Sequence, residues 1–217
     1  MSSVEVALPA GRPLPRKVER FLDRAEDVRS AWFESTSSVH RPGFVASDPV
    51  AVWTALSAIA DAHLAPGPVF CEWGSGLGVA TALASYLGFD AYGIEVDPEL
   101  VEAAEDLCAD FAPEARFEVG SFLPEDTEID GLLGEELDWL DTSAAPAYED
   151  MGLDVDEIDL VYAYPWPGEE FAVYECFEQH AANGALLLTW HGLEGMKLRR
   201  KASERRRRPG RGRTRGR

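Results

Sequence analysis

Residues 69–78 read Val-Phe-Cys-Glu-Trp-Gly-Ser-Gly-Leu-Gly. The apolar start is typical of a buried strand, and an amphipathic helix is expected over Val79–Leu87. The glycines between strand and helix allow the backbone to turn tightly and to approach a ligand closely. Because the helix begins directly after them, its unpaired N–H groups point toward the same place. The sequence therefore predicts a ligand-binding turn.

Short apolar runs and amphipathic helices alternate through the rest of the chain. Further strands are expected at 91–95, 116–119, 158–163 and 185–190, with helices after Asp97-Pro98 and over 171–180. Met196–Lys201 can add an edge strand. Strands that alternate with helices predict an α/β fold with a doubly wound, mostly parallel sheet.

Outside this alternation the chain divides into segments of different composition. Residues 1–13 are expected to be a flexible tail, and 14–47 an N-terminal helix (16–33) followed by a loop. The main domain is expected over 48–196, and it starts with a helix capped by Asp48-Pro49. Within it, the acidic insertion 124–157 is long enough to be a lid, a specificity element or a disordered segment.

Charge is divided very unevenly. The formal net charge is −19, but residues 197–217 hold 12 basic residues and one acid, which leaves −30 on residues 1–196. No Lys or Arg occurs from Phe117 to Met196. Such an acidic body repels nucleic acid and attracts cationic ligands, although acidity also serves solubility or salt adaptation.

The basic end of the chain, 197–217, is expected to be disordered beyond its first residues. Three interpretations remain open for it. Arginine-rich tails bind RNA or acidic surfaces, this one could lie on its own acidic body, or it could be a reading-frame artefact.

The sequence also bears on membrane association, secretion, disulfides and metal sites. The longest apolar run, Pro49–Ala60, is too short to span a bilayer, and the N-terminus lacks the features of a secretory signal. The three cysteines are widely spaced and form neither a metal-ligand pair nor a disulfide framework. We expect an acidic, reduced, cytoplasmic protein with no membrane association and no metal site.

An acid, Glu95, follows the second strand and lies 17 residues beyond Gly78. A carboxylate at that strand end can accept hydrogen bonds from both hydroxyls of a ribose. A dinucleotide site requires Gly-x-Gly-x-x-Gly or Ala, and Val79 occupies the sixth position counted from Gly74. The pattern Glu-x-Gly-x-Gly-x-Gly, from Glu72 to Gly78, fits another group.

In this pattern the chain resembles the class I S-adenosylmethionine-dependent methyltransferases over roughly residues 68–191. The motifs that carry the resemblance are Glu72–Gly78, Gly93-Ile94-Glu95-Val96-Asp97 and Val119-Gly120-Ser121-Phe122. The resemblance implies a Rossmann-like sheet of order 3-2-1-4-5 and the cofactor S-adenosyl-L-methionine.

The resemblance also implies roles for individual residues. Glu95 would hold the ribose, Val96 and Phe122 would enclose the adenine, and Glu72 would stand behind the glycines. Ser121 stands where many members of the family have an aspartate. The implied cofactor-binding residues are Glu72, Gly74, Ser75, Gly76, Gly78, Glu95, Val96, Gly120, Ser121 and Phe122. The stretch Gly43–Ser47 would close over the cofactor.

The acceptor would lie after the fourth strand, at Tyr164-Pro165-Trp166-Pro167. Two prolines flanking a tryptophan make a stiff loop that presents aromatic side chains. Glu169, Glu170 or His191, at the end of the fifth strand, could take up a proton. The predicted catalytic residues are therefore Tyr164, Trp166, His191 and Glu169. The amine-acceptor motif of the family, which begins with Asn or Asp, is not present.

The sequence thus predicts a methyltransferase, a transferase that moves the methyl group of S-adenosylmethionine to an unidentified acceptor. Because the local charge is acidic, a neutral or cationic acceptor is favoured, and nucleic acid is expected only through the arginine-rich tail. Two alternatives stay open. One is an NAD(P)-binding oxidoreductase, and the other is a non-catalytic module that binds a nucleoside cofactor.

Overall fold

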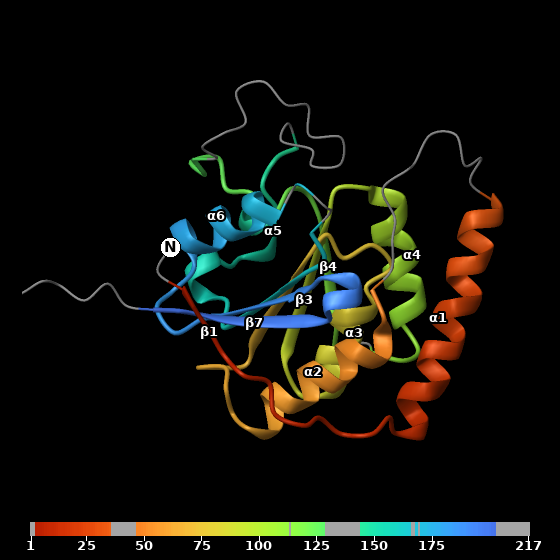
Figure 1. The fold of residues 1–217 in the computed structure, drawn as a ribbon. Helices are drawn as coiled ribbons and strands as arrows, with labels where there is room; N and C mark the ends of the chain where they lie inside the picture. Colours follow the sequence, from red (N-terminus) through yellow and green to blue (C-terminus); the bar gives the residue numbers. More distant parts are fainter. Residues whose placement is uncertain are drawn as a thin grey trace, which may run out of the picture.

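The computed structural model describes residues 3–35, 47–112, 114–128, 144–165, 168 and 170–202. In these ranges one sheet carries helices on both faces (Figure 1). The strands are β1 (Ser3–Glu5), β2 (Val69–Trp73), β3 (Asp90–Glu95), β4 (Arg116–Val119), β5 (Leu160–Ala163), β6 (Leu186–Trp190) and β7 (Met196–Lys201). The helices are α1 (Arg16–Ser35), α2 (Pro49–Asp61), α3 (Val79–Tyr86), α4 (Pro98–Cys108), α5 (Tyr148–Met151) and α6 (Glu170–His180), with 3-10 turns η1 (Val155–Glu157) and η2 (Gly192–Glu194).

The strand order is β1-β7-β6-β5-β2-β3-β4. Strands β4, β3, β2, β5 and β6 are parallel neighbours, which confirms the predicted order 3-2-1-4-5 and the Rossmann-like α/β class. The edge strand expected at Met196–Lys201 is present as β7, antiparallel to β6. In the described part of the chain, no helix combines the length and the apolarity needed to cross a membrane.

Two hydrophobic cores lie on the two faces of the sheet. Helices α1 to α4 pack on one face and enclose side chains such as Phe70, Leu160 and Leu188. Alternate residues of the same strands, such as Val161 and Leu187, point to the other face and pack with α6 and α5. This alternation is the period-two pattern of a sheet buried on both sides, so the apolar runs in the sequence follow directly from the architecture.

The N-terminal segment differs from the expected flexible tail. Ser3–Glu5 pairs antiparallel with Arg199–Lys201 and forms the edge of the sheet. Further along, the Arg12 amide donates to Ser57 Oγ (2.8 Å), and the Trp53 indole N–H donates to the Arg12 carbonyl (3.1 Å). These partners lie far away in the sequence, which is why local composition suggested a loose end.

Helix α1 lies against α3 and α4 at the side of the helical layer (Figure 1). Phe21 anchors it, since this fully buried ring contacts Tyr86 and Phe111 at centroid distances of 5.9 and 5.8 Å. Burial of a phenylalanine in an aromatic cluster contributes on the order of 3 kcal/mol. The anchor fixes the inner face of α1 beside the start of α3.

Part of the acidic insertion belongs to the folded body. Ala147, Tyr148 and Val155 are buried in the core under α6, and Ser121 forms a bridge with Pro146. Residues 129–143 of the insertion lie outside the described ranges, as do 203–217 of the basic tail and the loop residues 36–46. The predictions made for those segments stay predictions.

Candidate functional site

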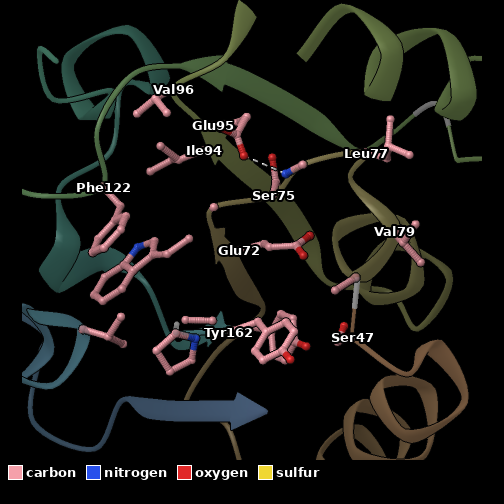
Figure 2. A pocket seen from close by; sticks show the side chains of 18 of the residues that line it. Ser47, Glu72, Ser75, Leu77, Val79, Ile94, Glu95, Val96, Phe122 and Tyr162 are labelled. Atoms are coloured by element: carbon pink, nitrogen blue, oxygen red, sulfur yellow. Dashed lines mark hydrogen bonds between the residues drawn. The ribbon is translucent and has the colours of Figure 1, made fainter. Parts of the chain in front are cut away.

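A cavity of about 240 Å³ opens at the carboxyl ends of β2, β3 and β5 (Figure 2). In open parallel sheets this edge is where ligands bind, because the loops after neighbouring strands converge there. The walls come from the loop between β2 and α3, the ends of β3 and β4, the segment after β5, and the inner face of α1. The start of α2 and part of α6 also contribute, so several separate parts of the chain form one concave site.

The glycine loop adopts the backbone expected of it. Gly74 and Gly78 have φ angles of 73° and 70°, in the left-handed region that side chains with a Cβ rarely adopt. The amides of Gly74 and Ser75 both donate to the carbonyl of Ile94 (2.9 and 2.8 Å), which ties the loop to β3. The loop is therefore held in place before any ligand arrives.

Glu95 closes the other side of this loop. Its Oε2 accepts a hydrogen bond from the Gly76 amide (2.9 Å, the dashed line in Figure 2), and its Oε1 accepts one from the Asp97 amide (3.1 Å). Burial raises the pKa of this carboxyl, while the backbone amides of Gly76, Asp97 and Val96 oppose that shift. Each oxygen keeps a second lone pair, so the fixed carboxylate can still accept from a ligand hydroxyl.

Glu72 is the most deeply buried acid of the cavity, with 7% of its surface exposed. Its Oε2 accepts from the Thr81 amide (2.8 Å) and the Thr81 hydroxyl (2.7 Å). Burial raises its pKa to about 8, the bonds from Thr81 lower it, and the nearby Glu95 charge raises it again. A carboxyl in this setting is protonated over much of the physiological pH range.

The structure brings most of the predicted cofactor residues to this cavity. Gly78 is the exception: it caps α3 behind the loop, and a Cβ there would meet Phe117. Phe122 reaches the cavity while one face of its ring stacks on Trp73, with centroids 5.0 Å apart and planes at 11°. The predicted residues that line the wall are Glu72, Gly74, Ser75, Gly76, Glu95, Val96, Gly120, Ser121 and Phe122.

The structure describes two of the four predicted catalytic residues, Tyr164 and His191. Tyr164 lines the cavity together with Pro165, whereas Trp166 and Glu169 lie outside the described residues. His191 is not among the lining residues. Its Nε2 lies 2.9 Å from the Thr189 hydroxyl and 3.3 Å from the Tyr174 hydroxyl, and burial and Lys197 lower its pKa. Of the predicted catalytic residues that the structure describes, Tyr164 therefore lines the cavity and His191 does not.

Sequence reasoning missed several residues of the wall. The most informative lie on α1, where Glu26 and Arg29 pair with each other, with Nη2 to Oε1 at 2.5 Å and Nε to Oε2 at 2.8 Å. The amphipathic pattern predicts which face of α1 is buried, but it does not predict which residues that face contacts. Trp73 could have been predicted as a lining residue, because it directly precedes Gly74 in the sequence. Ser47, from the stretch predicted to close over the cofactor, lines the wall. The other missed lining residues are Leu22, Ala25, Pro49, Leu77, Val79, Ala80, Ile94, Tyr162, Ala163, Ala172 and Val173.

The cavity contains a polar atom for which the described residues offer no hydrogen-bond partner. This atom is Ser75 Oγ, which is buried, and Ser75 as a whole is 5% exposed. Burying a hydroxyl without a hydrogen bond costs about 1–3 kcal/mol, so a ligand that pairs with it gains that amount. Within the described residues, no three His, Cys, Asp or Glu side chains gather as a metal site. The donor set fits an organic ligand with hydroxyl and charged groups.

The raised pKa of Glu72 predicts a pH-dependent stability. An acid whose pKa is about 8 when folded and about 4.5 when unfolded holds its proton more tightly in the folded state between those values. Stability is then highest below about pH 4.5 and falls as the pH rises toward 8. We expect wild type to lose stability relative to Glu72→Gln across this window in chemical denaturation. A difference in unfolding free energy between the two proteins that stays the same across this window would contradict the assignment.

Comparison with known proteins gives matches of fold. No protein-family model matches the chain, and no curated protein matches it. Similar solved structures include an RNA methyltransferase from Salinibacter ruber in complex with S-adenosyl-L-homocysteine, at 18% identity and a TM-score of 0.49, covering 74% of this chain and 95% of that chain. A methyltransferase from Geobacter sulfurreducens is 15% identical at a TM-score of 0.48, covering 89% and 100% of the two chains. A TehB-like SAM-dependent methyltransferase from Corynebacterium glutamicum is 16% identical at a TM-score of 0.40, covering 81% and 73%. At identities of 15–18%, these likenesses concern the fold alone.

Proposed function

We propose that this protein is a methyltransferase that binds S-adenosylmethionine in the cavity and methylates a neutral or cationic small molecule. The observation that carries the proposal is the pairing of the glycine loop with Glu95. The Gly76 amide holds the Glu95 carboxylate at 2.9 Å on the cavity wall, at the carboxyl end of β3. A carboxylate held in this way supports binding of two ribose hydroxyls, beside a turn whose glycines let the protein backbone approach a ligand closely.

The residues of the wall fit the parts of this cofactor. Ile94, Val96 and Phe122 supply apolar surface for a purine next to Glu95. Gly74 and Gly76 leave room for the amino-acid part, and the amides of Val79 and Ala80 at the start of α3 favour its carboxylate. Glu72 and Glu95 favour its positive charges. A dinucleotide fits less well, because Val79 occupies the sixth position of the dinucleotide pattern, where a small residue lets the helix pack closely on the strand.

When bound, S-adenosylmethionine supplies an electrophilic methyl group on a positively charged sulfur. The chain's own residues contribute binding, orientation and exclusion of water, and alignment of reactants accounts for much of the rate in such reactions. Tyr164 and Pro165 lie on the cavity wall after β5, the strand that pairs with β2 and so adjoins the glycine loop. The Tyr164 hydroxyl is a polar group at that end of the cavity that can orient an acceptor.

Charge supports an acceptor without phosphates. The titratable lining residues of the described wall are Glu26, Glu72, Glu95, Arg29 and two tyrosines, and Arg29 is already paired with Glu26. The acidic body, with −30 over residues 1–196, repels a polyanion. RNA is therefore the less favoured acceptor, although the RNA methyltransferase from Salinibacter ruber is similar in fold.

Methyl transfer can be followed with radiolabelled S-adenosylmethionine. The purified protein is incubated separately with a pool of small amines and aromatic alcohols and with total RNA, and the label in each pool is counted. We expect label in the small-molecule pool, and Tyr164→Ala is expected to lower kcat more than tenfold while the KM for the cofactor changes less than twofold. Label in RNA alone would overturn the acceptor class. Cofactor binding with no label in any pool would favour a non-catalytic module.

A further inference from the structure

Phe122 presents an aromatic ring to the cavity just after the end of β4. Figure 2 shows this ring on the side of the cavity that Ile94 and Val96 also line. Because the Trp73 indole stacks on one face of the ring, with centroids 5.0 Å apart, a flat ligand group can stack only on the other face. Residues 120–123 belong to no helix or strand, so the place of the ring depends on what holds this loop.

The folded end of the acidic insertion holds the loop by its backbone. The Ser121 amide donates to the Ala145 carbonyl (2.8 Å), and the Ala147 amide donates to the Ser121 carbonyl (3.0 Å). The two segments lie in close contact, since a Cβ at Gly120 would lie 2.8 Å from the Ala145 carbonyl oxygen and 3.0 Å from the Ala147 Cβ. Residues 145–147 therefore fix the two residues that precede Phe122.

Tyr148 holds the backbone of Phe122 itself. It begins the one-turn helix α5, packs in the core with α6 and is 7% exposed. Its hydroxyl donates to the Phe122 carbonyl at 2.7 Å, while the Cys176 thiol of α6 lies 3.6 Å from the same oxygen and is the weaker donor. Burial raises the pKa of Tyr148 well above its usual value, so the hydroxyl keeps its proton and stays a donor.

We propose that Tyr148 is a positioning residue for ligand binding, which holds the Phe122 carbonyl and thereby keeps the Phe122 ring stacked on Trp73 and in place for the purine of the ligand. Tyr148 acts through Phe122 and not by contact with the ligand. The inference rests on the proposed function of the cavity and adds a role for the folded end of the insertion. Because coupling between two sites is reciprocal, a bound purine should also stabilise the contact of the loop with residues 145–148.

The expected size of the effect follows from the strength of stacking. Stacking of a base on an aromatic side chain is worth about five- to 150-fold in affinity. Tyr148→Phe leaves both rings in place but frees the Phe122 carbonyl, so we expect part of this to be lost, about tenfold for S-adenosylhomocysteine. The ligand 5′-methylthioadenosine, which has the same purine and ribose but no amino-acid group, should weaken by the same factor. A loss confined to S-adenosylhomocysteine would place the effect at the amino-acid end and overturn the proposal.

A double-mutant cycle measured by calorimetry separates positioning from a general effect on the fold. We expect Tyr148→Phe to weaken binding of S-adenosylhomocysteine about tenfold when residue 122 is phenylalanine, but less than twofold in the Phe122→Ala background. Equal weakening in both backgrounds, or none in either, would overturn the proposal. Tyr174→Phe is the matched control, because it removes a hydroxyl that lies 3.3 Å from His191 Nε2 outside the cavity, and it should bind as wild type does.

Hydrogen exchange tests the same contact on wild-type protein and decides the question if Tyr148→Phe does not fold. We expect S-adenosylhomocysteine to slow amide exchange in peptides that cover 145–148 as well as in those that cover 120–123. Slower exchange over 120–123 with unchanged exchange over 145–148 would contradict the proposal. If S-adenosylhomocysteine does not bind wild type, the proposed function itself fails, whereas binding that Tyr148→Phe leaves unchanged overturns only this inference.

Discussion

Replacing Glu95 with alanine is expected to lower the affinity for S-adenosylhomocysteine by at least about a hundredfold. Two hydrogen bonds from ribose hydroxyls to a buried carboxylate would be lost, and each is worth roughly 1.5–3 kcal/mol. The Gly76 amide would also lose its acceptor, which loosens the glycine loop. Calorimetry on the variant and on wild type measures the change.

Two further variants make this result interpretable. Glu95→Gln keeps one carbonyl oxygen for Gly76 or for a hydroxyl, so its affinity should fall between those of wild type and Glu95→Ala. Glu102→Ala removes an exposed acid from the neighbouring helix α4 and should bind as wild type does, which controls for the loss of one negative charge. Wild-type affinity in a folded Glu95→Ala protein would remove Glu95 from the site.

Substituting Gly78 with alanine is expected to destabilise the fold by about 3 kcal/mol, or about 10 °C in Tm. The φ angle of 70° strains any residue with a Cβ. The added Cβ would also lie 2.4 Å from the Phe117 ring and 3.2 Å from the Ala104 Cβ, both in the core. Strain and overpacking therefore add at this position.

Gly74→Ala separates these two contributions. Its φ angle of 73° is nearly the same, but nothing lies within 4 Å of the Cβ that alanine would bring. Only the backbone strain remains, so we expect a loss of about 1 kcal/mol. Thermal unfolding of both variants beside wild type measures the difference. Equal losses would contradict the packing of Gly78 against Phe117.

The sequence was sufficient to predict the parallel sheet, because the patterns that indicate its strands, turns and helix caps are local. The N-cap at Asp48, for example, accepts from the Val50 and Ala51 amides as the Asp-Pro pattern predicts, and the Asp97 cap accepts from Glu99. The spacing from the glycine loop to Glu95 likewise depends only on one strand–helix–strand unit. Features of this kind are encoded within a few tens of residues.

The features that the sequence did not predict depend on distant partners. Strand β1 forms because Ser3–Glu5 pairs with the free edge of β7, which lies almost 200 residues later in the sequence. The contribution of α1 to the cavity depends on the contacts of Phe21 with Tyr86 and Phe111. No local sequence pattern predicts these contacts. His191 was placed by topology at the correct edge of the sheet, yet its side chain pairs with Thr189 and Tyr174 instead of lining the cavity.

The central claim is that the cavity at the carboxyl ends of β2 and β3 binds an adenosyl amino acid. It is tested most directly by titrating purified wild-type protein with S-adenosylhomocysteine and, in parallel, with NAD. We expect one molecule of S-adenosylhomocysteine to bind per chain with a micromolar Kd, and NAD to bind far more weakly. Binding of NAD without binding of S-adenosylhomocysteine would contradict the account.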